Sequence, residues 1–379
     1  MEFAIWGYPW DLRDEGPTRV ATRLREIGVS ELNLATNYHT VQAFTPHNPT
    51  RRTHFARASS YFRPDDRYGR LEPVPYEGME GDWVDEIADQ VPDLTLTAWT
   101  VGCHNSRLGM AHPDLTIESP HGDDLVFGLC PTNPAVHEYL VAVVGDLADR
   151  DQFDRIELET FDYFYGTGFG WHHQKIHARL GTLGEFLLGL CFCEHCRAAA
   201  ADAGIDVETV RETAAQTLDH IVAGRVPHDL SPDRWLRSQP AVADYVDLRE
   251  RTLADLYADL ADAADGTPLG YYAGMPDPGR EWLVGADLNR LADYVDYYCV
   301  PAYESSRDAV LDAYRTVDEL TPEIPIHVGV LPGHPAIHDE ATVVDIVDGL
   351  RAIDVPRVSF YNYGLLPERS LEWIESATH

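Results

Sequence analysis

The segment Arg155-Ile156-Glu157-Leu158-Glu159-Thr160-Phe161-Asp162 decides the fold, because two of its carboxylates alternate with apolar side chains in a strand pattern. Successive side chains of a strand point to opposite faces, so Ile156 and Leu158 share one face while Glu157 and Glu159 share the other. The apolar pair fits under covering helices, which places both glutamates inside a closed sheet. Buried carboxylates are costly unless they are paired, hydrogen-bonded or needed for chemistry. The segment therefore predicts a barrel strand with Glu159 at the mouth and Glu157 one layer deeper.

Seven further strand patterns alternate with amphipathic helical patterns on either side of this segment. The predicted strands are Phe3–Tyr8, Glu31–Asn37, Leu94–Val101, Arg155–Phe161, Leu269–Gly274, Tyr294–Tyr303, Ile324–Val330 and Val358–Tyr363. Strict alternation predicts a parallel sheet, and eight units favour closure into an α/β (β/α)8 TIM barrel over residues 1–379. A long insertion follows the fourth strand, and we expect residues 162–242 to form a subdomain. No Gly-rich phosphate-binding motif follows any strand, so no organic cofactor is expected.

The charge balance is strongly acidic, with 29 Lys and Arg against 63 Asp and Glu and a net charge of −34. Such a surface repels nucleic acids and anionic membranes, so neither is an expected partner. The acids are scattered through the chain and Lys175 is its one lysine, a pattern that favours adaptation to a high-salt cytoplasm over binding of a cationic partner. The N-terminus shows no signal-peptide pattern, which fits a cytoplasmic protein. The sequence does not determine the oligomeric state and is compatible with a homo-oligomer.

A TIM barrel carries its chemistry at the carboxyl ends of its strands, so catalytic groups are expected at these ends. Glu159 is the predicted general acid, since burial and the like charge of Glu157 would raise its pKa. Glu304, after the sixth strand, is the predicted base or nucleophile, because glycoside hydrolysis needs two carboxylates. The alternative is that the register of the fourth strand slips and one of its two glutamates lies at the surface or pairs with an arginine. For Glu304 the alternative is an ordinary acidic surface residue.

Polar and aromatic side chains gather at the other strand ends. Aromatic faces stack on the C–H surfaces of sugars, while amide and imidazole groups bind hydroxyls, so this composition predicts a carbohydrate substrate. The candidate substrate-binding residues are Trp6, Tyr8, Asn37, His39, Trp99, His104, His172, His173, Tyr272, Tyr303, His334, Tyr361 and Asn362.

Three of the six cysteines crowd into Cys191-Phe192-Cys193-Glu194-His195-Cys196, a C-x-C-x-x-C pattern. Three thiolates this close can share a tetrahedral Zn²⁺ with a fourth ligand from elsewhere, and a closed site of four ligands is structural. Cys130 is the first choice for the fourth ligand, with Cys103 and His195 as alternatives.

The cysteine run, set after the fourth strand, resembles the zinc cluster of family 42 beta-galactosidases. The phrase Leu129-Cys130-Pro131-Thr132-Asn133-Pro134 is similar to a segment of uncharacterised glycosidase-like barrels that pair such a cysteine with a later C-x-C-x-x-C. The resemblance implies a glycoside hydrolase-like barrel. The chain departs from family 42 in two places, since Leu158 rather than asparagine precedes Glu159 and the seventh strand carries no carboxylate.

A chitinase-like, substrate-assisted mechanism is a related alternative, in which Glu157, Glu159 and Tyr303 would fill the places of the acidic pair and the tyrosine. A metal-dependent sugar isomerase or epimerase of the xylose-isomerase-like type is a second alternative, although the eighth strand offers no acid. A non-catalytic carbohydrate-binding barrel is the third.

Overall fold

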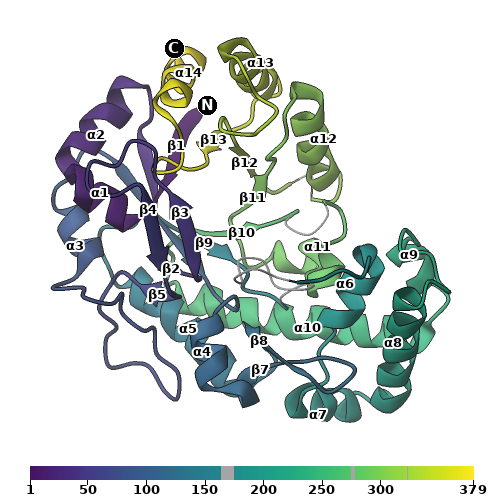
Figure 1. The fold of residues 1–379 in the computed structure, drawn as a ribbon. Coiled ribbons are helices and arrows are strands. Elements are labelled where there is room, and N and C mark those ends of the chain that lie inside the picture. The colour runs from purple at the N-terminus through teal and green to yellow at the C-terminus, as the bar shows by residue number, and fades with distance from the viewer. Residues whose placement is uncertain (164–174, 275–277, 322) are drawn as a thin grey trace.

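The computed structural model describes residues 1–163, 175–274, 278–321 and 323–379. Eight parallel strands form a closed barrel, because each pairs with the next along the chain and β1 pairs with both β2 and β13 (Figure 1). The strands are β1 (Glu2–Gly7), β2 (Glu31–Tyr38), β6 (Thr95–Val101), β9 (Arg155–Glu159), β10 (Leu269–Tyr272), β11 (Tyr297–Pro301), β12 (Ile326–Val330) and β13 (Arg357–Phe360). The prediction of a (β/α)8 barrel is confirmed.

Helices cover the outside of the barrel between consecutive strands (Figure 1). Asn133 illustrates how the sequence starts them, since its side chain accepts from the backbone N–H of Ala135 and Pro134 occupies the first helical position. The covering helices are α1 (Pro9–Glu15), α2 (Pro17–Glu26), α3 (Trp83–Ala88), α5 (Pro134–Ala148), α10 (Pro240–Ala263), α11 (Leu288–Leu291), α12 (Arg307–Asp318), α13 (Glu340–Arg351) and α14 (Glu368–Thr378). None of the helices in the described ranges is long and apolar enough to cross a bilayer.

Insertions follow three of the strands. A hairpin of β3 (Val41–Phe44) and β4 (Thr53–Ala56) follows β2, and β5 (Ser59–Ser60) then pairs antiparallel with β2. The segment after β6 holds α4 (Ser106–Ala111), η1 (Pro113–Leu115), β7 (Thr116–Glu118) and β8 (Asp124–Leu129). The segment after β9 holds α6 (Gly181–Gly189), α7 (Glu194–Asp202), α8 (Val207–Val222) and α9 (Pro232–Leu236), and η2 (Glu281–Val284) follows β10. Helices α6 to α9 share an apolar cluster separate from that of the barrel, while the subdomain boundaries 162–242 stay a prediction.

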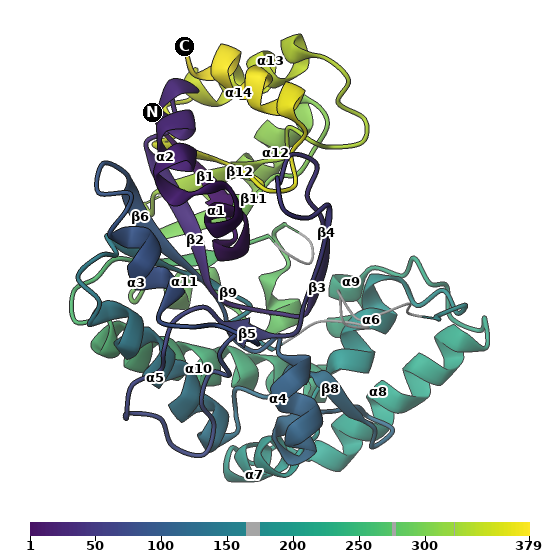
Figure 2. The same ribbon diagram turned by 60° about the vertical axis from the view of Figure 1, so that its left-hand side comes forward.

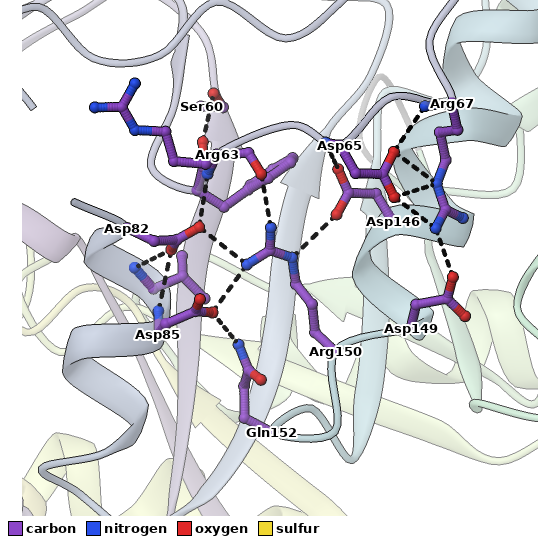
Figure 3. Close-up of polar contacts among 12 residues, drawn as sticks. Ser60, Arg63, Asp65, Arg67, Asp82, Asp85, Asp146, Asp149, Arg150 and Gln152 are labelled. Atoms are coloured by element: carbon purple, nitrogen blue, oxygen red, sulfur yellow. Dashed lines mark hydrogen bonds and ion pairs between the residues drawn. The ribbon is translucent and has the colours of Figure 1, made fainter.

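Arginines tie the long segment between β5 and α3 to neighbouring helices (Figure 3). Arg150 lies within 3.1 Å of carboxylate oxygens of Asp82, Asp85 and Asp146, and Asp82 also caps α3. Arg67, from the segment itself, pairs with Asp149 at the end of α5. Bridges among several partly buried charges hold a loop better than isolated surface pairs do. The network thereby fixes the path of a long segment that returns toward the barrel mouth.

Candidate active site

Glu157 lies inside the barrel, one layer below the mouth, and is fully buried. Its carboxylate accepts from Arg357 Nη2 at 2.8 Å, Tyr272 OH at 2.7 Å and Asn33 Nδ2 at 3.2 Å, which come from three other strands. Only a side chain in the lumen can meet partners from so many strands. Burial raises the pKa of Glu157, while the Arg357 guanidinium opposes that rise. Glu157 is therefore an ion-paired carboxylate inside the lumen.

Glu159 lies two residues further along the same strand and is only partly covered. The indole N–H of Trp99 donates to its Oε2 at 2.6 Å. Burial raises the pKa of Glu159 to about 7, the charge of Glu157 adds to the rise, and the Trp99 hydrogen bond opposes it. A carboxyl group with this pKa exchanges its proton near neutral pH, which suits a general acid.

The chain turns sharply after Glu159. Thr160 has a φ of 54°, in the left-handed region that a β-branched residue rarely adopts. The turn is held by backbone bonds, since Gly102 N donates to the carbonyl of Glu159 and Cys103 N to that of Thr160. Residues with strained backbone conformations of this kind concentrate at functional sites, where contacts with the surrounding structure hold them in place.

Aromatic rings surround Glu159 at the mouth. The hydroxyls of Tyr8, Tyr38 and Tyr361 lie 3.1–3.4 Å from one another, and the ring of Trp99 contacts that of Tyr38 at a centroid distance of 4.6 Å. Tyr303 packs on Tyr361 at 5.2 Å. Burial raises the pKa of these phenols, so they remain neutral hydroxyls at physiological pH. Tyr8, Tyr38 and Trp99 are buried, so the partly exposed rings of Tyr303 and Tyr361 are the aromatic groups of this cluster that face solvent beside Glu159.

Tyr38 was not among the predicted site residues, although Asn37 was. A register shift between Ala35 and Asn37 turns this part of β2, so that the Asn37 amide donates outward to the Val101 carbonyl at 2.7 Å and to Tyr139 of α5 at 3.2 Å. Tyr38 consequently occupies the mouth. The signal for Tyr38 was a tyrosine at a strand end, but a bulge is not visible in the alternation.

The two predicted histidines near β2 and β6 lie beside the aromatic mouth. His39 stacks on Tyr38 at 4.2 Å and on His104 at 4.4 Å. Burial lowers the pKa of His39 to about 4, so its imidazole ring is neutral at physiological pH. The pair extends the aromatic surface from the mouth toward the rim.

The remaining predicted binding residues are dispersed. Trp6 is buried one layer down and its indole N–H donates to Tyr272 OH, the same hydroxyl that donates to Glu157. Asn362 is fully buried and accepts from Gly364 N at 3.1 Å, while His334 accepts from Ala336 N in a turn after β12. These contacts indicate local structural roles for Asn362 and His334. His172 and His173 lie outside the described residues.

Glu304, the predicted second carboxylate, is exposed at the rim after β11. Its backbone N–H donates to the carbonyl of Ala302, in a tight turn that sets the ring of Tyr303 against Tyr361. The chain therefore brings Glu304 next to a ring of the mouth, and its catalytic role stays a prediction.

Asp162 is a buried carboxylate that sequence reasoning did not single out. Tyr271 OH donates to its Oδ2 at 2.8 Å, and burial raises the pKa of Asp162 to about 7. Tyr271 alternates with Tyr272 and packs on Tyr257 of α10 at 5.6 Å, so it faces the helices. Asp162 therefore lies behind the sheet and not in the mouth.

Four buried cysteines meet at the base of the insertions. The Sγ atom of Cys130 lies 3.5–3.7 Å from those of Cys196, Cys191 and Cys193, and all four lie within 4.8 Å of one another. Four ligands 2.3 Å from a tetrahedral ion lie about 3.8 Å apart, so the cluster fits a metal ion. The structure groups Cys130, and neither Cys103 nor His195, with the other three cysteines, while its role as the fourth zinc ligand stays a prediction. Within the described residues it is the one such group of three or more Cys, His, Asp or Glu.

Comparison with known proteins supports the fold but does not identify a family. No protein-family model and no curated protein matches the chain. The glycoside hydrolase domain of PgaB (BpsB) from Bordetella bronchiseptica is similar over 100% of this chain and 99% of its own, with a TM-score of 0.62 and 13% identity.

Two beta-galactosidases are also similar over 100% of this chain. The enzyme from the psychrophilic Marinomonas ef1 has a TM-score of 0.60 at 12% identity, and the polyextremophilic enzyme from the Antarctic haloarchaeon Halorubrum lacusprofundi has 0.56 at 15%. The chain spans 59% and 57% of these two proteins. This chain therefore has a glycosidase-like (β/α)8 barrel fold.

Proposed function

We propose that the protein is a glycoside hydrolase in which Glu159 is the general acid. The observation that supports it best is a protonatable carboxyl group at the barrel mouth, with a pKa of about 7, ringed by tyrosine and tryptophan side chains. Water-poor surroundings keep such a group protonated near neutral pH while it faces a bound sugar.

In the proposed reaction, Glu159 gives its proton to the glycosidic oxygen as the bond from that oxygen to the anomeric carbon breaks. Glu304 is the proposed second carboxylate. Its exposure suits a base that takes a proton from an attacking water, whose oxygen then bonds to the anomeric carbon. Glu157 holds the pKa of Glu159 up through its charge and does not itself touch the substrate.

The mouth residues are proposed to bind the sugar on which Glu159 acts. Tyr303 and Tyr361 are partly exposed and offer ring faces and hydroxyl groups to a sugar. The buried side chains of Trp99, Tyr8 and Tyr38 lie behind them, where Trp99 holds Glu159 and the two tyrosine hydroxyls hold that of Tyr361. Aromatic side chains supply large apolar contact with a polar tip, which matches the mixed surface of a sugar ring.

We also propose that Cys130, Cys191, Cys193 and Cys196 hold a structural Zn²⁺. Four thiolates form a closed site without a free position, so the ion would supply folding energy and no chemistry.

The test of the acid is the leaving-group dependence of Glu159→Gln. Aryl glycosides with 4-methylumbelliferyl and 2,4-dinitrophenyl leaving groups would be compared over several sugars. We expect kcat/KM to fall about 100-fold or more with the poorer leaving group. The loss should be much smaller with dinitrophenol, which departs without protonation.

Asp162→Asn is the matched control, because it removes a buried carboxyl of similar pKa that lies outside the lumen, and its kcat/KM should stay within a few-fold of wild type. Glu159→Gln should melt no lower than wild type at pH 8, since the neutral amide removes a cost on the order of 3 kcal/mol for ionising a partly covered carboxyl whose pKa is raised. Full activity of a folded Glu159→Gln would exclude the acid role. Sugar binding that survives in both Glu159→Gln and Glu304→Gln, with no turnover by wild type, would indicate a binding barrel instead.

A further inference from the structure

A polar hollow lies near the mouth, between the β3–β4 hairpin and α4. It has a volume of about 460 Å³, and Arg57, Arg107, Phe55 and Tyr76 are among its lining residues. Thr40, also in the lining, is two residues past Tyr38 of the mouth, and Ser59 pairs with Tyr38 across β5 and β2. The hairpin stands on the side of the barrel where the strands end (Figure 2). The hollow therefore adjoins the proposed active site.

The guanidinium groups of Arg57 and Arg107 line this hollow, and Glu77 is the one carboxylate residue in the described lining. Arg107 donates to Ser59 Oγ at 3.1 Å and to the Ala58 carbonyl, and the side chain of Arg57 is exposed. Neither forms an ion pair with any described residue, whereas Arg51, nearby on the same hairpin, pairs with Asp14. Unpaired arginines side by side are unexpected in a chain with 63 acidic residues.

The charges of the two arginines act on each other. The pKa of Arg107 is lowered by burial and by the charge of Arg57, and Glu77 at the edge of the hollow opposes this only in part. Holding two like charges together costs free energy that a bound anion would recover. Arginine is also the side chain best shaped to bind a carboxylate or sulfate through paired hydrogen bonds.

Aromatic rings lie next to these charges. Phe55 is 61% exposed, and its strand neighbour Phe44, on the same face of the hairpin, is 64% exposed. Large exposed apolar side chains that gather on one face indicate a binding surface. Tyr76 adds a half-buried ring held against His54. A ring for the C–H face of a sugar and two guanidinium groups for an anionic substituent together match one unit of an acidic glycan.

We propose that this hollow is a substrate subsite for an anionic sugar unit, with Arg57 and Arg107 binding its carboxylate or sulfate group and Phe55 stacking on its ring. The proposal rests on the proposed glycosidase activity only in taking the ligand to be a saccharide. The net charge of the chain does not prevent binding, because distant acids are screened over about 10 Å at 0.1 M salt.

The test is affinity electrophoresis in 0.1 M salt with the Glu159→Gln protein, which keeps the polysaccharides intact. Two matched pairs of probes are cast into the gels: polygalacturonate against fully methyl-esterified pectin, and dextran sulfate against dextran. The anionic member of at least one pair should retard the protein while its neutral partner does not. Retardation by the first pair identifies a carboxylate ligand, and retardation by the second a sulfate ligand.

Arg57→Gln combined with Arg107→Gln should weaken this retardation about ten-fold or more. Arg251→Gln combined with Arg315→Gln is the control, since it removes equal charge from exposed sites on α10 and α12. Arg57→Gln alone serves if the double variant unfolds, because the Arg57 side chain is exposed and forms no hydrogen bond or ion pair with any residue in the described ranges. Equal retardation by neutral and anionic probes, or an unchanged double variant, would overturn the proposal. Hydrolysis is not measured, so a failure of the proposed function would leave this result standing.

Discussion

The hydrogen bond from Trp99 to Glu159 lets the assignment of the acid be tested through pH dependence. The bond favours the ionised carboxylate, so its loss in Trp99→Phe should raise the pKa of Glu159 above about 7. An acid must be protonated to act, and the alkaline limb of kcat/KM should therefore move to higher pH, by roughly one pH unit for one charge-assisted bond.

Trp6→Phe is the control for this shift, since it removes an indole donor that serves Tyr272 one layer below. Its alkaline limb should stay in place even if turnover slows. An unmoved limb in Trp99→Phe would mean that Glu159 is not the group whose ionisation ends activity.

Glu157 and Glu159 show what the alternation of side chains along a strand can predict. The strict pattern of β9 predicts that Glu157 and Glu159 face inward, and bonds from β2, β6, β10 and β13 place both there. The pattern fails at Asn37, where a bulge turns the strand, because an inserted residue leaves no mark on the polarity of its neighbours. The pattern also fails at Asn362, which lies beyond the last residue of β13. Side chains alternate between the two faces only within a strand, so alternation does not predict the direction of Asn362.

At the scale of elements, the cysteine cluster joins the start of α5 to the segment between α6 and α7. Cys130 precedes α5, Cys193 is the N-cap of α7, and the carbonyl of Cys191 accepts from Tyr245 of α10. We expect about one Zn²⁺ per chain by elemental analysis. Cys196→Ser should lose that ion, melt at lower temperature and be cleaved faster by protease within residues 175–242, because metal binding contributes folding energy.

Cys103→Ser is the matched control, since Cys103 is also buried but lies outside the cluster. It should keep the metal. If Cys196→Ser keeps its full metal content, the four cysteines are not the metal site. If the wild type holds a metal other than zinc, the identity of the ion is wrong.

Local patterns predicted the barrel elements better than the insertions between them. None of the eight predicted strands covers residues 38–80, yet this segment folds β3, β4 and β5. The strands Val41–Phe44 and Thr53–Ala56 are four residues each, and Pro46 and Pro49 interrupt the chain between them. Pairs this short are stabilised by tertiary contacts, such as the stacking of His54 on Trp10, which no local pattern records.

For the whole molecule, the net charge of −34 predicts that salt stabilises the fold. Like charges repel in the compact state, and raising KCl from 0.1 to 1 M shortens the screening length from about 10 Å to about 3 Å. Surface pairs such as Arg70–Asp114 weaken as well, but each contributes less than about 1 kcal/mol. We expect the melting temperature at pH 7.5 to rise by roughly 5 °C, about 4 kcal/mol for a chain of this length. The same series at pH 5, near the sequence pI of about 4.6, is the control, because most of the net charge is gone there. A rise of equal size at both pH values would mean that salt acts on apolar burial, and the case for adaptation to high salt would lose its physical basis.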